Sequence, residues 1–406
     1  MPHSISFALS VLGLMLGVLL SHVGHADIAA EPLNRNRPLD PAGAHWAWYL
    51  DFNVDDIANS RFVLFDADTA RMKGSLGSGA FPTMHASPDG RFYYVAESWL
   101  RGPRRIREDF VTIYDASSLQ IDGVIELPGA RRALMSPRDR TVLTADGSLL
   151  LVFNFTPSTS LTVIDLASRT IKGDVPTPGC SLAYPTSSRG VSMICGDGSL
   201  LTIHFGSDGT VLAQHRSKPF FNPDKDPLIE NGVSLEGVWY FTTYGGQAHS
   251  VDLRGEEPVF GSPWPLVDQN KKPANFLASI FTMGKAGPWL PGGFQILTVH
   301  EPTRRLYALT HPITWSEGKG DHVFPGAEVW VYDIDEQKRI DRIKLRDVGI
   351  SIHVTPDESP LLLVGAVDIE TEEFRLEVYD AESGDFLREL EEPGEVMFHF
   401  QGVSGR

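Results

Sequence analysis

Cysteine is scarce in this chain: its 406 residues include only two, Cys180 and Cys195. Two thiols are too few for a disulfide scaffold, an iron–sulfur cluster or an all-cysteine zinc site. If the chain is exported to an oxidising compartment, the two can pair, and a loop of this size would stabilise the fold by about 3 kcal/mol. The alternative is a reactive thiol, but no histidine lies beside either cysteine to activate it. We therefore expect one disulfide.

Basic residues are also in deficit, with 35 Lys and Arg against 52 Asp and Glu, which gives a net charge of −17. A surface of this sign repels phosphates and argues against a nucleic-acid partner. Hydrophobic residues make up 42% and charged residues 21%, the balance of a globular protein. The length by itself would allow two or three domains.

Long apolar runs are absent except near the start. Residues 5–20 form an uncharged, predominantly apolar run, and Gly24 and Ala26 fit the small-residue pattern of a signal-peptidase site. We expect residues 1–26 to be a signal peptide cleaved after Ala26, followed by an N-terminal extension over residues 27–50. The alternative is an uncleaved anchor, because no Lys or Arg precedes the run, although 16 apolar residues are short for a membrane span.

Familiar catalytic motifs are missing as well. The chain has no G-x-S-x-G elbow, H-E-x-x-H pair, Walker A motif or dinucleotide fingerprint. The stretch GSLGSG (74–79) lacks the Lys-Ser/Thr ending of a phosphate loop, and we interpret it as a turn. The ten histidines after residue 26 show no metal-ligand spacing, so no metal site is predicted.

Helical periodicity is hardly seen, and a strand–turn–strand pattern recurs instead. A copy is a β-rich segment that ends at an aspartate in six of seven cases, passes through a turn and resumes as a strand. The aligned positions are Asp66, Asp115, Asp165, Phe205, Asp252, Asp333 and Asp380. An aspartate at such a turn can accept a hydrogen bond from the backbone two residues further on, so we interpret the repeated aspartates as structural.

Further strand candidates lie between these hairpins, so each period of 40–50 residues holds about four strands. This is the arithmetic of a β-propeller. We predict an all-β fold, a seven-bladed β-propeller of four-stranded antiparallel blades, over residues 51–406. Residues 262–294 form an insertion with five prolines and two tryptophans, Trp264 and Trp289. It is either a lid packed on the propeller or a partner contact.

One local cluster of positive charge stands out in this acidic chain. It consists of Arg101, Arg104, Arg105 and Arg107. The cluster is either a solvated loop offset by nearby acidic residues or a docking loop for a carboxylate-rich protein, to which arginine can donate paired hydrogen bonds. Trp99 and Leu100 beside it are candidate apolar anchors.

These pieces together resemble the heavy (α) subunit of the quinoprotein amine dehydrogenases, nearer the aromatic-amine than the methylamine type. The strongest match is residues 179–209, which hold both cysteines and the C-G-D-G-S-L turn, continued by RSKPFF (216–221). Further matches are the arginine loop before DFVTIYD, WLPGGF (289–294), the HP…H loop between His311 and His322, and FHFQGVSG (398–405).

The resemblance implies a periplasmic propeller that pairs with a small light (β) chain in an α2β2 heterotetramer. The cofactor would be tryptophan tryptophylquinone on the light chain, and this chain would hold no cofactor and no catalytic residue. The reaction would be oxidative deamination of a primary amine to an aldehyde and ammonia, with electrons passed to a small copper protein or a cytochrome c. Trp99 or Leu100 would line the substrate channel.

Two other functions remain open at this point. One is a stand-alone propeller hydrolase such as a lactonase, which needs carboxylates or histidines converging on the channel around a divalent metal. The other is a non-enzymatic propeller that only binds proteins. The loop WLRGPRRIRE (99–108) departs from the family's more regular arginine–glycine run, and residues 273–287 look like an extra insertion, so the amine class is not settled.

Overall fold

Strands, and no helices, make up the regular structure of the part of the chain that the computed structural model describes. The described residues are 38–53, 55–103, 106–127, 129, 131–132, 140–186, 189–267, 289–312, 322–391, 393–394 and 396–403. All of them except Pro38 belong to one compact unit, Leu39–Arg406. The predicted signal peptide lies outside the described residues. No helix among the described residues could cross a membrane.

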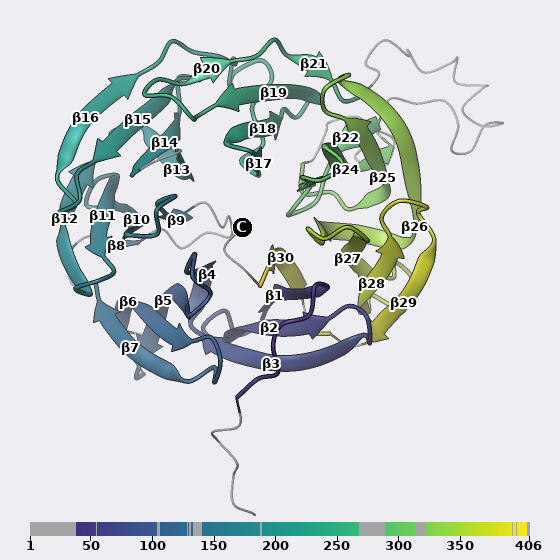
Figure 1. Ribbon diagram of the computed structural model, residues 1–406, viewed down its shortest axis with the longest axis horizontal. Helices are drawn as coiled ribbons and strands as arrows, with labels where there is room; N and C mark the ends of the chain where they lie inside the picture. The colour runs from purple at the N-terminus through teal and green to yellow at the C-terminus, as the bar shows by residue number, and fades with distance from the viewer. Residues whose placement is uncertain are drawn as a thin grey trace, which may run out of the picture. The chain divides into compact units, whose positions relative to one another are not determined.

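The strands are hydrogen-bonded into six antiparallel sheets arranged around a central axis (Figure 1). The first sheet has the order β3 (Arg71–Ser78), β2 (Ser60–Asp66), β1 (Trp46–Phe52), β30 (Val396–Gly402). The second has the order β4 (Ala80–Ala86), β5 (Phe92–Arg101), β6 (Ile106–Asp115), β7 (Ile121–Glu126). The third has the order β12 (Thr170–Pro176), β11 (Ser160–Asp165), β10 (Leu149–Thr156), β8 (Arg131–Arg132), and β9 (Thr141–Leu143) also pairs with β10.

The remaining three sheets complete the set. The fourth has the order β13 (Cys180–Pro185), β14 (Gly190–Cys195), β15 (Leu200–Phe205), β16 (Val211–Arg216). The fifth has the order β17 (Val233–Leu235), β18 (Val238–Thr242), β19 (Gln247–Asp252), β20 (Val259–Phe260), and β21 (Trp264–Pro265) also pairs with β19. The sixth has the order β22 (Trp289–Pro291), β24 (Arg305–Pro312), β25 (Gly326–Asp333), β26 (Lys338–Val354), β27 (Leu361–Val367), β28 (Phe374–Asp380), β29 (Phe386–Glu391), and β23 (Leu297–His300) also pairs with β24.

The all-β propeller is therefore confirmed, but the predicted seven separate four-stranded blades are wrong. Five sheets form separate blades of four or five strands, and the sixth is a single eight-stranded sheet. The difference arises at β26, which is 17 residues long: residues 338–349 pair with β25 and residues 348–354 pair with β27. No Pro-Gly or Asn-Gly turn signal interrupts this stretch, so the chain stays extended and one strand joins both halves of the sheet.

The two ends of the described chain meet in the first sheet. β1 pairs with β2 on one side and with the C-terminal β30 on the other. The boundary expected at residue 51 falls inside β1, because the apolar residues from Trp46 onward already pair with β2. Pairing of distant segments closes the ring, so the first sheet can form only when both ends of the chain are in place.

The repeated aspartates do what the pattern predicts, because all six cap a hairpin turn. Asp66, Asp252, Asp333 and Asp380 each accept a hydrogen bond from the amide two residues on, at 2.9–3.0 Å. Asp115 does so at 3.1 Å, and Asp165 accepts from the Ser168 amide, three residues on, at 2.8 Å. The degenerate copy with Phe205 uses Asp208 instead, which accepts from the Thr210 amide.

The segment GSLGSG is strand and crossover, so its interpretation as a turn is wrong. β3 continues to Ser78 and β4 begins at Ala80, which leaves Gly79 as the link between two blades. A Cβ at Gly79 would lie 2.3 Å from the Ser98 carbonyl oxygen, so only glycine permits this close approach.

Candidate functional site

A central channel passes between the inner strands and forms a cavity of about 510 Å³. Its lining comes from β4, β9, β13, β17, β23, β26 and β30, and includes His85 and His353. The His85 ring is hydrogen-bonded to the Thr141 carbonyl at 2.8 Å. No group of three or more His, Cys, Asp or Glu side chains among the described residues is placed to hold a metal ion.

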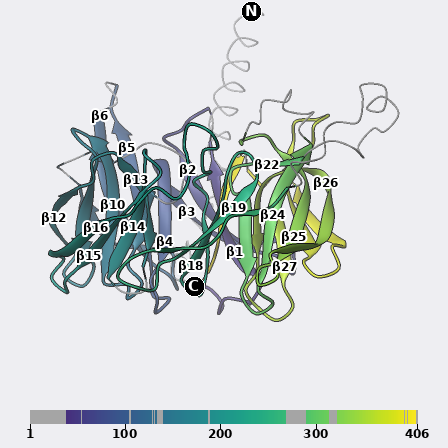
Figure 2. The same cartoon turned by 90° about the horizontal axis from the view of Figure 1, so that it is seen from above.

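Arg101 and Arg107, the two arginines of the cluster that the structure describes, lie on paired strands of a long β5–β6 hairpin. The strands pair from Phe92–Asp115 out to Arg101–Ile106. They are longer than the flanking strands of the same sheet, β4 with 7 residues and β7 with 6, and continue into a projecting arm (Figure 2). Arg104 and Arg105 lie outside the described residues. Period-two alternation then decides which side chains of the arm share a face.

Trp99 and Leu100 lie on opposite faces of this arm. Trp99 is 43% exposed and faces the same side as Arg101, whose Nε forms a 2.7 Å ion pair with Glu108. Leu100 is half-buried and lies opposite Arg107. A molecule that approaches the face of the arm formed by Trp99, Arg101 and Glu108 therefore meets Trp99 rather than Leu100. The role of either residue in a substrate channel stays a prediction.

Arg107 points to the other face, where its guanidinium forms hydrogen bonds within this chain. Its Nε donates to Asp109 Oδ1 at 2.7 Å, and its Nη2 donates to the carbonyl of Arg132 at 2.5 Å. Only 23% of its side chain is exposed, and the Asp109 side chain is fully buried. Of the predicted docking arginines, Arg101 is thus an exposed candidate, whereas Arg107 ties the arm to the neighbouring sheet.

Sequence reasoning missed the buried charges beneath the arm. Glu97, Asp109 and Arg132 are only 1–2% exposed. Arg132 comes from the next sheet, and its Nη1 donates to the Ser98 hydroxyl at 3.0 Å and to the Ala80 carbonyl at 3.1 Å. Glu97 accepts from the Gly79 amide at 2.6 Å and from the Thr112 hydroxyl. The only sequence signal is a charged residue inside an otherwise apolar strand, YYVAES (93–98).

Burial controls the protonation of these groups. It raises the pKa of Glu97, while the Thr112 hydroxyl, the Gly79 amide and the Trp99 side chain favour the carboxylate and oppose the shift. Burial also lowers the pKa of Arg132 to about 10, and the nearby Asp109 carboxylate acts in the opposite direction. Arg132 is therefore still charged at neutral pH.

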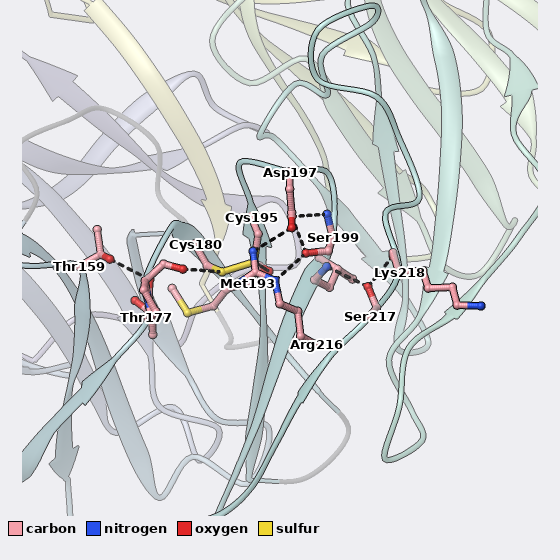
Figure 3. Close-up of a disulfide and its surroundings, with 12 residues drawn as sticks. Thr159, Thr177, Cys180, Met193, Cys195, Asp197, Ser199, Arg216, Ser217 and Lys218 are labelled. Atoms are coloured by element: carbon pink, nitrogen blue, oxygen red, sulfur yellow. Dashed lines mark hydrogen bonds and ion pairs between the residues drawn. A yellow bond between two sulfur atoms is a disulfide. The ribbon is translucent and has the colours of Figure 1, made fainter.

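The expected disulfide is present and joins directly opposed residues of β13 and β14, Cys180 and Cys195, with their Cα atoms 3.9 Å apart (Figure 3). The C-G-D-G-S-L turn follows at once. Asp197 accepts from the amide and the hydroxyl of Ser199, which lowers the pKa of Asp197 to about 2. Arg216 donates to both Asp197 and Ser199 at 3.1 Å.

The RSKPFF segment folds back on this same turn. The Phe220 amide donates to the Gly198 carbonyl at 2.9 Å. A Cβ at Gly198, which has a φ of +84°, would lie 2.2 Å from the Phe221 carbonyl oxygen. The disulfide, the turn after it and the RSKPFF segment, which belong to the strongest sequence match, are thus held together by direct contacts.

The two tryptophans of the 262–294 insertion pack onto the sheets. Trp264 is 4% exposed and contacts Tyr332, with ring centroids 5.6 Å apart, and Trp289 contacts Trp330 at 5.4 Å. This supports the packed alternative for both ends of the insertion, while residues 268–288 lie outside the described residues. The loop between His311 and His322 also lies mostly outside them; His322 stacks on Tyr244, with ring centroids 4.5 Å apart.

A propeller fold occurs in proteins of many functions, so we compared the sequence with known protein families. Residues 47–398 match the model of the methylamine dehydrogenase heavy chain (MADH) family. The chain belongs to this family. It is 28% identical to the methylamine dehydrogenase heavy chain of Methylorubrum extorquens over 372 residues, which cover 89% of this chain and 82% of the relative. It is also 28% identical to that of Paracoccus versutus, over 82% of this chain and 74% of the relative.

Membership of the methylamine dehydrogenase heavy chain family confirms the resemblance to the quinoprotein amine dehydrogenases and assigns the chain as an amine dehydrogenase subunit. The matched relatives are methylamine dehydrogenase chains, so a position nearer the aromatic-amine type stays a prediction.

Solved structures add the fold alone. A dihydro-heme d1 dehydrogenase aligns with a TM-score of 0.52 and 14% identity over 91% of this chain and 77% of its own. A protein from Lactobacillus plantarum aligns with a TM-score of 0.55 and 11% identity over 88% of this chain and 98% of its own.

Proposed function

We propose that this chain is the exported heavy subunit of a periplasmic amine dehydrogenase, which scaffolds a light chain and helps to form its substrate channel. The assembly is an α2β2 heterotetramer that converts a primary amine to an aldehyde and ammonia. Tryptophan tryptophylquinone on the light chain supplies the redox chemistry when it is present. Electrons leave to a small copper protein or a cytochrome c. Family membership over residues 47–398 carries this proposal.

The projecting arm is the part of this chain that suits a docking role best. A partly exposed tryptophan beside an exposed arginine is the combination that dominates protein interfaces. Trp99 and Arg101 provide it on one face of the arm, and Ile106, 60% exposed, lies opposite Arg101 on β6. The arm therefore offers an apolar anchor, a cation and a rigid two-stranded support.

The assembly and the activity are tested by co-expressing the full chain, leader included, with a methylamine dehydrogenase light chain. We expect a stable complex in size-exclusion chromatography and amine-dependent reduction of an artificial dye. Sequencing the N-terminus of the periplasmic protein tests cleavage after Ala26. Two results together would contradict the proposal: a folded heavy chain that forms no complex with the light chain, and no amine-dependent dye reduction by the co-expressed chains.

Trp99→Ala tests the substrate channel. If the indole lines the channel mouth, the ratio of kcat/KM for methylamine to that for 2-phenylethylamine should change by about tenfold, since removal of a contact of 1–2 kcal/mol has that effect. Ile121→Ala is the matched control, because Ile121 is 61% exposed on the outer strand of the same sheet. An unchanged ratio in assembled Trp99→Ala enzyme would remove Trp99 from the channel.

A further inference from the structure

The β5–β6 arm is built over three buried charges, Glu97, Asp109 and Arg132, and the partly buried Arg107. Removing charges from water is costly, and a well-packed apolar cluster of similar size is often as stable or more stable. Stability alone is thus a poor reason for this chain to bury the cluster. Such groups can instead fix one geometry, because each demands partners at defined positions.

The two faces of the arm are tied to different neighbours. On one face, Ser98 and Arg107 both donate to Asp109 Oδ1, at 2.6 and 2.7 Å, and Arg107 reaches the carbonyl of Arg132 in the next sheet. On the other face, Glu97 holds the amide of Gly79, the link from the preceding sheet. The base of the arm is thereby anchored from both sides.

The cluster also holds a strained residue. Arg132 Nη2 donates to the carbonyl of Phe81, whose φ is +46°. A left-handed conformation is sterically unfavourable for a non-glycine residue, so it persists only where its surroundings fix it. Arg132 therefore fixes the first residues of β4 as well as the base of the arm.

We propose that Glu97, Arg107, Asp109 and Arg132 are positioning residues that set the direction of the β5–β6 arm and so present Trp99 and Arg101 to the light chain. The proposal rests on the proposed function and deepens it. None of the four residues has to touch the light chain. They act through Trp99, which lies two residues from Glu97 on the same strand face.

The test uses the isosteric variant Asp109→Asn in the full-length chain. It keeps the volume but removes the charge that faces Arg107 and Arg132. We expect the affinity for the light chain to fall by about tenfold, the size typical of an indirect effect. Hydrogen exchange in residues 97–110 should become faster. Glu377→Gln is the matched control, since Glu377 is also fully buried, accepts from the Tyr379 hydroxyl at 2.6 Å and lies in a different sheet. It should lower the melting temperature and leave the affinity unchanged.

A double variant separates positioning from general destabilisation. If Asp109 acts through Trp99, Asp109→Asn should weaken binding much less in a Trp99→Ala background than in the wild-type chain. Additive losses from the two substitutions would contradict the proposal, as would a folded Asp109→Asn chain with wild-type affinity.

If Asp109→Asn does not fold, a milder variant can test the proposal instead. Ser98→Ala removes only the hydroxyl between Asp109 and Arg132, and we expect a smaller loss of affinity with the same dependence on Trp99. A Ser98→Ala chain with unchanged affinity and exchange would then overturn the proposal. Failure of the proposed function looks different, because the wild-type chain itself would then bind no light chain.

Discussion

At the scale of single residues, the backbone of the hairpin turns follows a common rule. The fourth residue after the capping aspartate is left-handed in five copies: Ala70, Leu119, Arg169, Gln337 and Gly384. Only the last copy places glycine there, and glycine is the residue that adopts this conformation without steric cost. The other copies therefore carry strain that is visible only once the dihedral angles are known.

Gln337→Gly should stabilise the protein by about 0.5–1 kcal/mol, because relief of about 1–2 kcal/mol of strain exceeds the entropy that glycine gains in the unfolded chain. Gln337 is exposed and has a φ of +54°. Urea denaturation measures the change. The reciprocal control, Gly384→Ala at the equivalent turn, should destabilise by about 1 kcal/mol. Equal midpoints for both variants and wild type would show that the turns are unstrained.

Gly293→Ala should destabilise by at least about 2 kcal/mol, the scale of overpacking in a core. Gly293 has a φ of +125°, and a Cβ there would lie 2.7 Å from the Ile350 carbonyl oxygen. Gly77→Ala is the control, because nothing lies within 4 Å of its Cβ position. Melting temperatures test the pair, and a Gly293→Ala chain as stable as Gly77→Ala would refute the steric argument.

At the scale of elements, the disulfide and the turn after it act together as a clamp on the fourth sheet. Cys180 and Cys195 face each other across β13 and β14, and Asp197 with Arg216 connects the turn to β16. The clamp crosses the whole sheet from its inner to its outer strand. Since it lies away from the β5–β6 arm in sequence and in sheet, we expect its function to be structural.

Replacing both Cys180 and Cys195 by serine should lower the free energy of unfolding by about 3 kcal/mol, the chain-entropy value for a loop closed over 15 residues. Activity per assembled complex should stay near wild type. Denaturation under oxidising conditions and dye-reduction assays of purified complex measure the two quantities. A large loss of specific activity in fully assembled protein would contradict a purely structural bridge.

At the scale of the whole molecule, ring closure depends on contacts between segments far apart in the chain. His45, just before β1, is hydrogen-bonded to Asp68 at 2.6 Å and to Asp357 at 3.0 Å. Burial lowers the pKa of His45, but the two carboxylates outweigh it and the pKa is raised overall. This histidine joins the start of the propeller to the β26–β27 connection, next to the strands that close the ring.

Ring closure through His45 should therefore depend on pH. Because its pKa is raised on folding, its contribution is fully present below the ordinary histidine pKa of about 6.5 and is lost as pH rises through the folded value. His45→Gln should lower the melting temperature more at pH 5.5 than at pH 9. The energy involved is at most about 1 kcal/mol, since Asp68 is 57% exposed. An equal effect at both values would show that His45 acts without its charge.

The sequence by itself determined the features that depend on neighbouring residues. The turn aspartates, the alternating strands and the two cysteines each act within one hairpin or between adjacent strands, so their spacing was enough to predict an all-β propeller with one disulfide. The residues of the C-G-D-G-S-L turn likewise identified the family. These signals are local because strand alternation and turn hydrogen bonds extend over only a few residues.

Only the tertiary structure decided the features that depend on distant pairing. It placed β26 in two pairings at once, which replaced seven separate blades by five and an eight-stranded sheet. It also set Trp99 on the exposed face of the arm and brought Arg132 from another sheet against Asp109. A sequence states which residues alternate along a strand, but the register and the neighbouring sheet determine which face is covered and which charge meets its partner.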